Sequence, residues 1–134
     1  MGAVREILNY PLLRVSYKDA NQLKRLLRMW SALDELGDKG DTVAISILID
    51  LQRVTGIDLD LYYRGHRKAF NMSYKKGILS FPQYMAIAYT LVLGYTQEEV
   101  AWVMGVDQSV ISRNINSGIK QMQMGLRAFE EEED

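Results

Sequence analysis

The second half of the chain carries three helix-start signals in close succession, and this arrangement constrains the fold more than any other feature. The segments Ser80–Gln83 and Thr96–Glu99 both have the capping-box pattern, in which the side chains of the first and fourth residues bond to each other's backbone N–H. Gly94 and Gly105 are placed to end the two helices that follow, and Asp107 is placed to cap a third helix. The segment therefore predicts three helices joined by tight turns.

The second and third of these helices have a distinctive spacing of small and apolar residues. Ala101 is small where two helices must approach closely, and Gly105 supplies a turn with positive φ that a side chain would resist. We expect Val106, Ile111 and Ile115 to be buried and to anchor the third helix against the second. This spacing is typical of a helix-turn-helix, which presents one helix to a DNA major groove.

The outward face of the predicted third helix is short and polar. At roughly 100° per residue, four polar residues lie opposite the Ile111–Ile115–Ile119 seam, with Ser112 on their flank: Ser109, Arg113, Asn116 and Lys120. Arginine matches the major-groove edge of guanine, asparagine that of adenine, and serine either. This chemistry suits the reading of base edges.

The run from Gly94 to Ile115, GYTQEEVAWVMGVDQSVISRNI, closely resembles the helix-turn-helix with which bacterial sigma factors read the −35 promoter element. It is also similar to the module of small phage and prophage late transcription regulators of the ArpU and RinA types. The resemblance covers about Leu79 to Met122, a third of the chain. The upstream segment GDTVAISILIDLQRV is weakly similar to a helix that precedes the module in such phage proteins.

The resemblance implies roles for individual residues. The third helix would enter the major groove and supply the base contacts: Gln108, Ser109, Ser112, Arg113 and Asn116. The phosphate contacts would come from the start of the second helix and from further along the third: Thr96, Gln97 and Lys120.

The charge of the chain is distributed unevenly. The net charge is −1, but five of the 17 acidic residues lie in the tail Glu130–Asp134, so the rest of the chain has 12 acidic residues against 16 basic ones. Residues 79–129 are close to neutral, whereas a DNA-binding surface needs cations to neutralise phosphates. We expect these cations to come from a second copy of the chain or from a basic segment: Arg64, Arg67, Lys68, Lys75 and Lys76. The alternative is that this segment is an ordinary solvated loop.

The pattern upstream of the helix-turn-helix also predicts helices. Asp19–Leu36 has one apolar stripe that a glycine ends, with three cations off the stripe: Lys24, Arg25 and Arg28. Thr42–Thr55 is apolar on nearly all sides, which favours a helix buried between others, although alternating isoleucines also fit a strand. Residues 57–77 fit either a helix or a short extended piece followed by a loop.

The expected architecture is an all-α helical bundle with a C-terminal, sigma-factor-like helix-turn-helix and a long last helix. Residues 1–77 would form an N-terminal helical region for oligomerisation or partner contact, and residues 78–129 the DNA-binding domain. The acidic tail, residues 130–134, is either a solvated terminus or an arm that competes with DNA for the basic surface.

Two apolar features each have two interpretations. Trp102 stands where related sequences usually have a charged residue, and it is either a partner surface, for example for RNA polymerase, or packed against the N-terminal helices. The apolar stripe of the third helix continues through Ile119, Met122, Leu126 and Phe129. This stripe forms either part of the core or a homodimer seam that presents two recognition helices to a two-fold site.

Composition argues against several other classes of protein. The chain is 48% hydrophobic and 25% charged, which is enough for a packed core, and it has no cysteine for a disulfide or a thiolate metal site. No apolar run approaches the ~20 residues of a membrane span, and the N-terminus lacks the features of a secretory signal. We therefore expect a cytoplasmic protein without membrane association.

Catalysis is not expected, because the chain has one histidine and no phosphate-binding glycine loop. No cofactor or metal is expected either, and we interpret Asp58, Asp60 and His66 as surface residues. The favoured function is a sequence-specific DNA-binding transcription regulator, sigma-like or a phage activator or repressor. Two alternatives are a phage small-terminase-type DNA-recognition subunit and a sigma-domain mimic that binds RNA polymerase without reading DNA.

Overall fold

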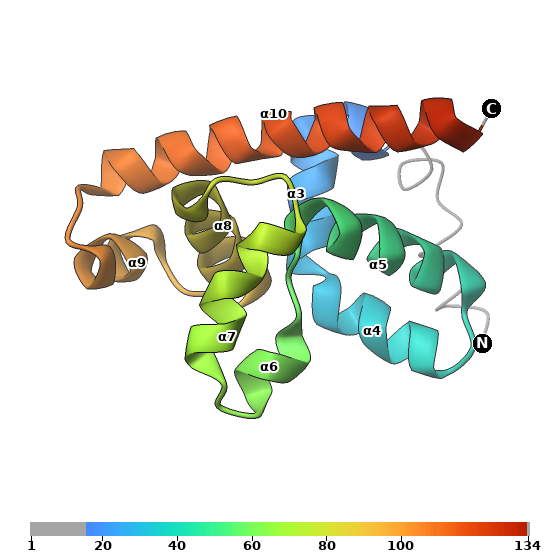
Figure 1. Ribbon diagram of the computed structural model, residues 1–134, viewed down its shortest axis with the longest axis horizontal. Helices are drawn as coiled ribbons and strands as arrows, with labels where there is room; N and C mark the ends of the chain where they lie inside the picture. The colour runs from blue at the N-terminus through green and yellow to red at the C-terminus, as the bar shows by residue number, and fades with distance from the viewer. Residues whose placement is uncertain (1–15, 134) are drawn as a thin grey trace.

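Every regular element between residues 16 and 133, the part of the chain that the computed structural model describes, is a helix. Within this range, the side chains of residue 16 and residues 129–133 are not described. With the labels of Figure 1, the elements are η1 (Ser16–Lys18), α3 (Ala20–Arg28), α4 (Trp30–Asp38), α5 (Thr42–Thr55), α6 (Leu59–Tyr63), α7 (Arg67–Met72), η2 (Ser73–Lys76), α8 (Phe81–Ile87), η3 (Ala88–Val92), α9 (Gln97–Met104) and α10 (Gln108–Glu133). The expectation of an all-α fold is confirmed.

One apolar core joins the two halves of the chain. The long helix α10 runs along one edge of the molecule (Figure 1) and packs on α8 and α9, and also on α3, α5 and η1. Its buried stripe enters a core that contains residues from α3 to α9: Ile111, Ile115, Ile119, Met122 and Leu126. The residues before and after position 77 therefore share this core. The interpretation of the stripe as core is confirmed for these five residues, whereas Phe129 lies outside the described side chains.

The segment predicted as one helix from Asp19 to Leu36 forms two helices, α3 and α4, which meet at Met29. Met29 leaves the helical conformation, with φ −91° and ψ 8°. The change of direction allows α3 to bury its leucines against α10 and η3, while α4 buries Trp30 and Leu33 against α5. Packing against different partners thus divides an apolar stripe that is continuous in the sequence.

Helix α5 has the predicted bounds but not the predicted burial. The Asp41 carboxylate accepts hydrogen bonds from the N–H groups of Val43 and Ala44, and Gly56 ends the helix at φ 79°. The strand alternative is therefore wrong. The expectation of a helix buried on all sides is also wrong, because Val43, Ile45 and Ile49 are between 40% and 48% exposed. Only the opposite side of α5 faces the core.

Residues 57–77, for which the sequence left two interpretations, form two short helices and a 3-10 turn (α6, α7 and η2). Phe70 is fully buried, and its ring lies edge-on to the rings of Tyr62 and Tyr89. The hydroxyl of Tyr84 donates a hydrogen bond to the Phe70 carbonyl at 2.5 Å. The aromatic residues of this segment therefore attach α6 and α7 to α8.

Both predicted capping boxes are present. The Gln83 N–H donates to the Ser80 hydroxyl while the Ser80 N–H donates to the Gln83 side chain, at 3.3 and 3.0 Å. Thr96 and Glu99 make the same pair of bonds, both at 3.0 Å. After α8 the helix continues as the π-helical turn η3, and Gly94 then turns the chain with φ 86°. No helix within residues 16–133 is long and apolar enough to span a bilayer.

Candidate functional site

The connection between α9 and α10 is a three-residue turn that begins at Gly105. Gly105 has φ 70°, and the N–H of Val106 donates to the Ala101 carbonyl at 3.0 Å. Asp107 precedes α10, and its carbonyl accepts a hydrogen bond from the Val110 N–H at 3.0 Å. Ala101 is buried as expected, but Val106 is 38% exposed, so the prediction that it anchors α10 is wrong. Ile111 and Ile115 fill that role, and Val106 remains in the turn at the surface.

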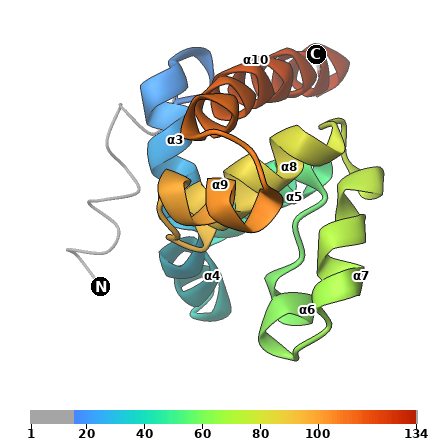
Figure 2. The ribbon, with the colours of Figure 1, turned by 90° about the vertical axis from the view of Figure 1, so that its left-hand side faces the viewer.

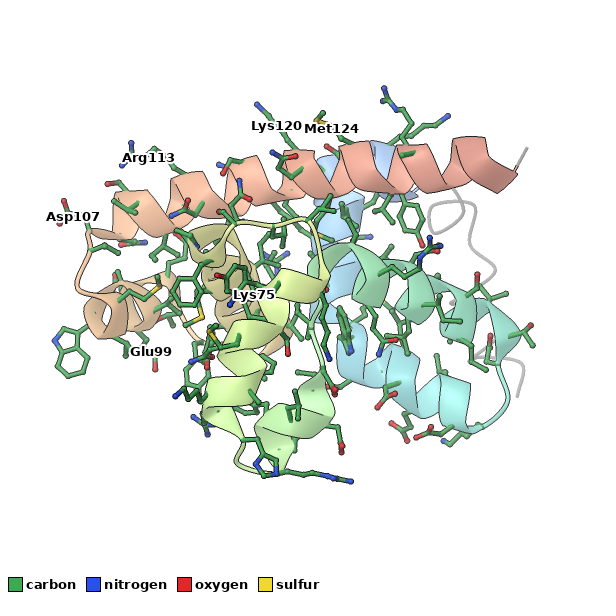
Figure 3. The ribbon with its side chains drawn as sticks, in the orientation of Figure 1. Lys75, Glu99, Asp107, Arg113, Lys120 and Met124 are labelled. Carbon is green, nitrogen blue, oxygen red and sulfur yellow. The ribbon has the colours of Figure 1, made fainter. Side chains whose placement is uncertain are left out.

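The side of α10 that faces away from the core holds the expected polar residues. Arg113 and Lys120 point outward from the body of the molecule (Figure 3), and Met124 shares this face. The remaining exposed side chains expected to contact bases are Gln108, Ser109 and Asn116, whereas Ser112 is half-buried on the flank. The ion pairs found among the described side chains lie elsewhere, in α4 and at the end of α6. The cations of this face therefore have no carboxylate partner within residues 17–128.

Asn116 is joined to α3, a contact that spacing in the sequence does not indicate. The ammonium group of Lys24 donates a hydrogen bond to Asn116 Oδ1 at 3.0 Å. Asn116 stays exposed and keeps both amide N–H donors and a second lone pair on Oδ1. The only sequence signal for this neighbour is that Lys24 lies off the apolar stripe of its helix. The contact brings a cation from the N-terminal half to the edge of the α10 face.

At the start of α9, the polar groups of Thr96 and Glu99 bond mainly to each other in the capping box. Thr96 Oγ1 accepts a hydrogen bond from the Glu99 N–H, so its lone pairs are partly used. Hydrogen bonds from the Thr96 backbone N–H and then from its side chain hold the pKa of Glu99 below the ordinary value. Gln97 is half-buried. This arrangement sets a carboxylate beside the two residues expected to contact phosphate.

The basic segment lies away from α3. In Figure 2, α3 flanks α10 on one side and α6 and α7 lie on the other. Arg64 pairs with Asp60 at 3.1 Å, and the Arg67 guanidinium stacks over the Tyr62 ring at 4.1 Å from its centroid. Lys75 lies below α10 (Figure 3), and the lysines of this segment are exposed: Lys68, Lys75 and Lys76. Nothing in these contacts joins the segment to the outward face of α10.

A mainly apolar groove of about 640 Å³ lies beside α9. It is lined from α7, α8, η3 and α9, and its polar lining includes Arg67 and Asn71 from α7 and Glu98 and Glu99 from α9. Burial raises the pKa of Tyr89 on its wall, and a hydrogen bond with Tyr95 raises the pKa of Tyr62 nearby. The groove is bordered by two strongly exposed apolar side chains of α9, Trp102 at 84% and Val103 at 75%. Packing of Trp102 against the N-terminal helices is therefore wrong.

The acidic residues near His66 have structural roles of their own. Asp58 caps α6 by accepting from the Asp60 N–H, and Asp60 pairs with Arg64. Within the part of the chain that the structure describes, no three histidine or carboxylate side chains lie together as a metal site would need.

Comparison with known proteins identifies no relative of this chain. Neither a protein-family model, nor a curated protein, nor a solved structure matches the chain. The function has to be inferred from the surface of the molecule.

Proposed function

We propose that this protein is a sequence-specific DNA-binding transcription regulator in which α9, the Gly105 turn and α10 act as a helix-turn-helix. In this proposal α10 lies in the major groove with its outward face against the base edges. Arg113 would bind a guanine, and Ser109 and Asn116 would contact neighbouring bases. Helix α9 would cross the phosphate backbone.

One observation carries the proposal: α10 presents an arginine, a lysine and uncharged hydrogen-bonding side chains on one exposed face. Arg113 and Lys120 point outward from the same helix and have no carboxylate partner among the described side chains. The opposite side of α10 is fully occupied by the core. An arginine without a carboxylate partner, together with exposed Ser and Asn side chains on a helix that core packing holds in place, is suited to direct base readout.

The test begins with selection of duplexes that the protein binds from a random pool. On the selected duplex we expect Arg113→Ala to weaken binding by roughly 5- to 150-fold, the cost of one bidentate base contact. Gln121→Ala is the matched control, because Gln121 is also polar and exposed on α10 but lies outside the proposed reading face. Equal affinity of the Arg113 and Gln121 variants for the selected duplex would remove Arg113 from the interface, and failure to select any duplex would reject the function.

A second function, binding to a protein of the transcription machinery, is favoured by the exposed side chains of α9. Trp102 and Val103 are exposed next to the apolar groove, and exposed tryptophans often serve as anchors in protein interfaces. Trp102→Ala should abolish the copurification of RNA polymerase while leaving DNA affinity unchanged. Polymerase binding that persists in this variant would argue against a role for α9.

A further inference from the structure

We infer that the N-terminal half of the chain forms part of the DNA interface, with Lys18 and Lys24 contacting the phosphate strand that runs beside α10. This inference rests on the proposed function and extends it to η1 and α3. It assigns the phosphate-neutralising charge to a different segment from residues 64–76, which were one of the sources expected from the sequence.

Two hydrogen bonds fasten this segment to one flank of α10. Lys24 Nζ bonds to Asn116 Oδ1 at 3.0 Å, and Gln123 Nε2 donates to the Tyr17 carbonyl at 3.0 Å. Asn116 and Gln123 lie two turns apart, about 10 Å along the helix. Lys18 directly follows Tyr17 and is exposed. The two lysines are thus held beside α10 at two separate points along its length.

The dimensions of B-DNA place a phosphate strand at this position. The major groove is about 12 Å wide, and a helix with its side chains is about 10–12 Å across. A helix in the groove therefore has one phosphate strand along each of its sides. A segment in hydrogen-bond contact with the flank of α10 lies against one of these strands.

The distribution of charge supports the same surface. The segments Ser16–Arg28 and Asp107–Ala128 together contain two carboxylates and seven cations: Lys18, Lys24, Arg25, Arg28, Arg113, Lys120 and Arg127. One of the carboxylates, Asp19, is engaged in capping α3. The next segment, Trp30–Asp41, contains four carboxylates and one lysine. Up to Ala128, cations therefore outnumber carboxylates on the two elements that meet at Lys24 and Asn116, and the four glutamates of α10, residues 130–133, all lie at its C-terminal end.

The test is the salt dependence of binding to the selected duplex. Each phosphate contact contributes about 0.9 to the slope of log K against log salt concentration. We expect Lys18→Ala and Lys24→Ala each to reduce the magnitude of this slope by about 0.9, with losses in affinity that fade at high salt. Lys39→Ala removes the same charge from the far end of α4 and should leave the slope unchanged.

Lys24→Gln separates the effect of the Lys24 charge from the effect of its hydrogen bond to Asn116, because glutamine keeps an N–H donor but has no charge. A reduced slope in Lys24→Gln supports the phosphate contact. Weaker binding with an unchanged slope in both Lys24 variants would show that Lys24 only orients Asn116, which overturns its assignment here. If the wild-type chain binds the duplex and both lysine variants behave like Lys39→Ala, the inference fails and the proposed function stands. If the wild-type chain binds no duplex at low salt, both fail.

Discussion

Gly77 lies so close to the backbone of Thr55 that a β-carbon at residue 77 would come within 2.5 Å of the Thr55 carbonyl carbon. The N–H of Ile78 donates to the Val54 carbonyl at 3.0 Å at the same point. The end of α5 and the loop that leads to α8 therefore touch backbone to backbone. This contact sets the position of α8, on which α10 packs.

A methyl group at residue 77 should therefore destabilise the whole fold. Backbone atoms cannot move aside as a side-chain end can, so we expect Gly77→Ala to cost about 3 kcal/mol in the free energy of unfolding. Gly65→Ala is the matched control. Gly65 has φ 82°, but a methyl group there would meet no atom beyond its chain neighbours within 4 Å, so only backbone strain of about 1 kcal/mol is expected. Urea unfolding measures both, and equal losses would contradict the close contact.

The buried hydroxyl of Tyr84 gives a second prediction about stability. Tyr84→Phe leaves the Phe70 carbonyl without its donor, which should cost about 1–3 kcal/mol, whereas Tyr63→Phe at the surface should cost little. Burial raises the pKa of Tyr84 above that of a free tyrosine. The contribution of the protonated Tyr84 side chain to the free energy of unfolding is thus fully present below the ordinary tyrosine pKa, and it declines as the pH rises above that pKa. Alkaline unfolding should be steeper in the wild type than in Tyr84→Phe, and identical curves would contradict this.

The capping box of α9 should respond to acid. The pKa of Glu99 lies below its unfolded value, so the stabilisation from this carboxylate is present above the unfolded pKa and is lost as the pH falls through the folded one. Titration of the Glu99 side-chain carbon by NMR should give a lower pKa in the native chain than in urea. Thr96→Ala should raise the native value toward the unfolded one. A pKa that is the same in the folded and unfolded chains would mean that the box does not form.

The two tryptophans should differ sharply in solvent contact. Trp30 is 2% exposed and Trp102 is 84% exposed. In Trp30→Phe the remaining fluorescence should be quenched readily by iodide, and in Trp102→Phe it should be protected. Trp102→Ala should change the free energy of unfolding by no more than about 0.5 kcal/mol. Protection of Trp102 from iodide in the isolated chain would contradict its exposure.

Local hydrogen bonding explains which parts of the fold the sequence could predict. The starts at Ser80 and Thr96 and the end at Gly56 depend on residues within four positions of each other, so their signals are complete in a short stretch. The break at Met29 has no glycine or proline to announce it, because packing against different partners causes it. Exposure of Val106 likewise depends on how the rest of the chain surrounds the turn.

Of the candidate site, the sequence could predict only the part that lies on a single helix, α10. The 3.6-residue period places Arg113 and Lys120 outward without any knowledge of the rest of the fold. Lys24 and Asn116 are 92 residues apart, so no spacing rule connects them, and their contact appears only in three dimensions. The cations of α3 were visible as residues off an apolar stripe, but their place beside α10 was not.

The most direct test of the proposal that α10 reads bases is a thermodynamic cycle between Arg113 and guanine N7. Each guanine of the selected duplex is replaced in turn by 7-deazaguanine, which lacks this major-groove acceptor, and binding of the wild type and of Arg113→Ala is measured. We expect one position at which the replacement weakens the wild type but has little further effect on Arg113→Ala. Losses that simply add at every guanine would contradict base reading by Arg113 through N7.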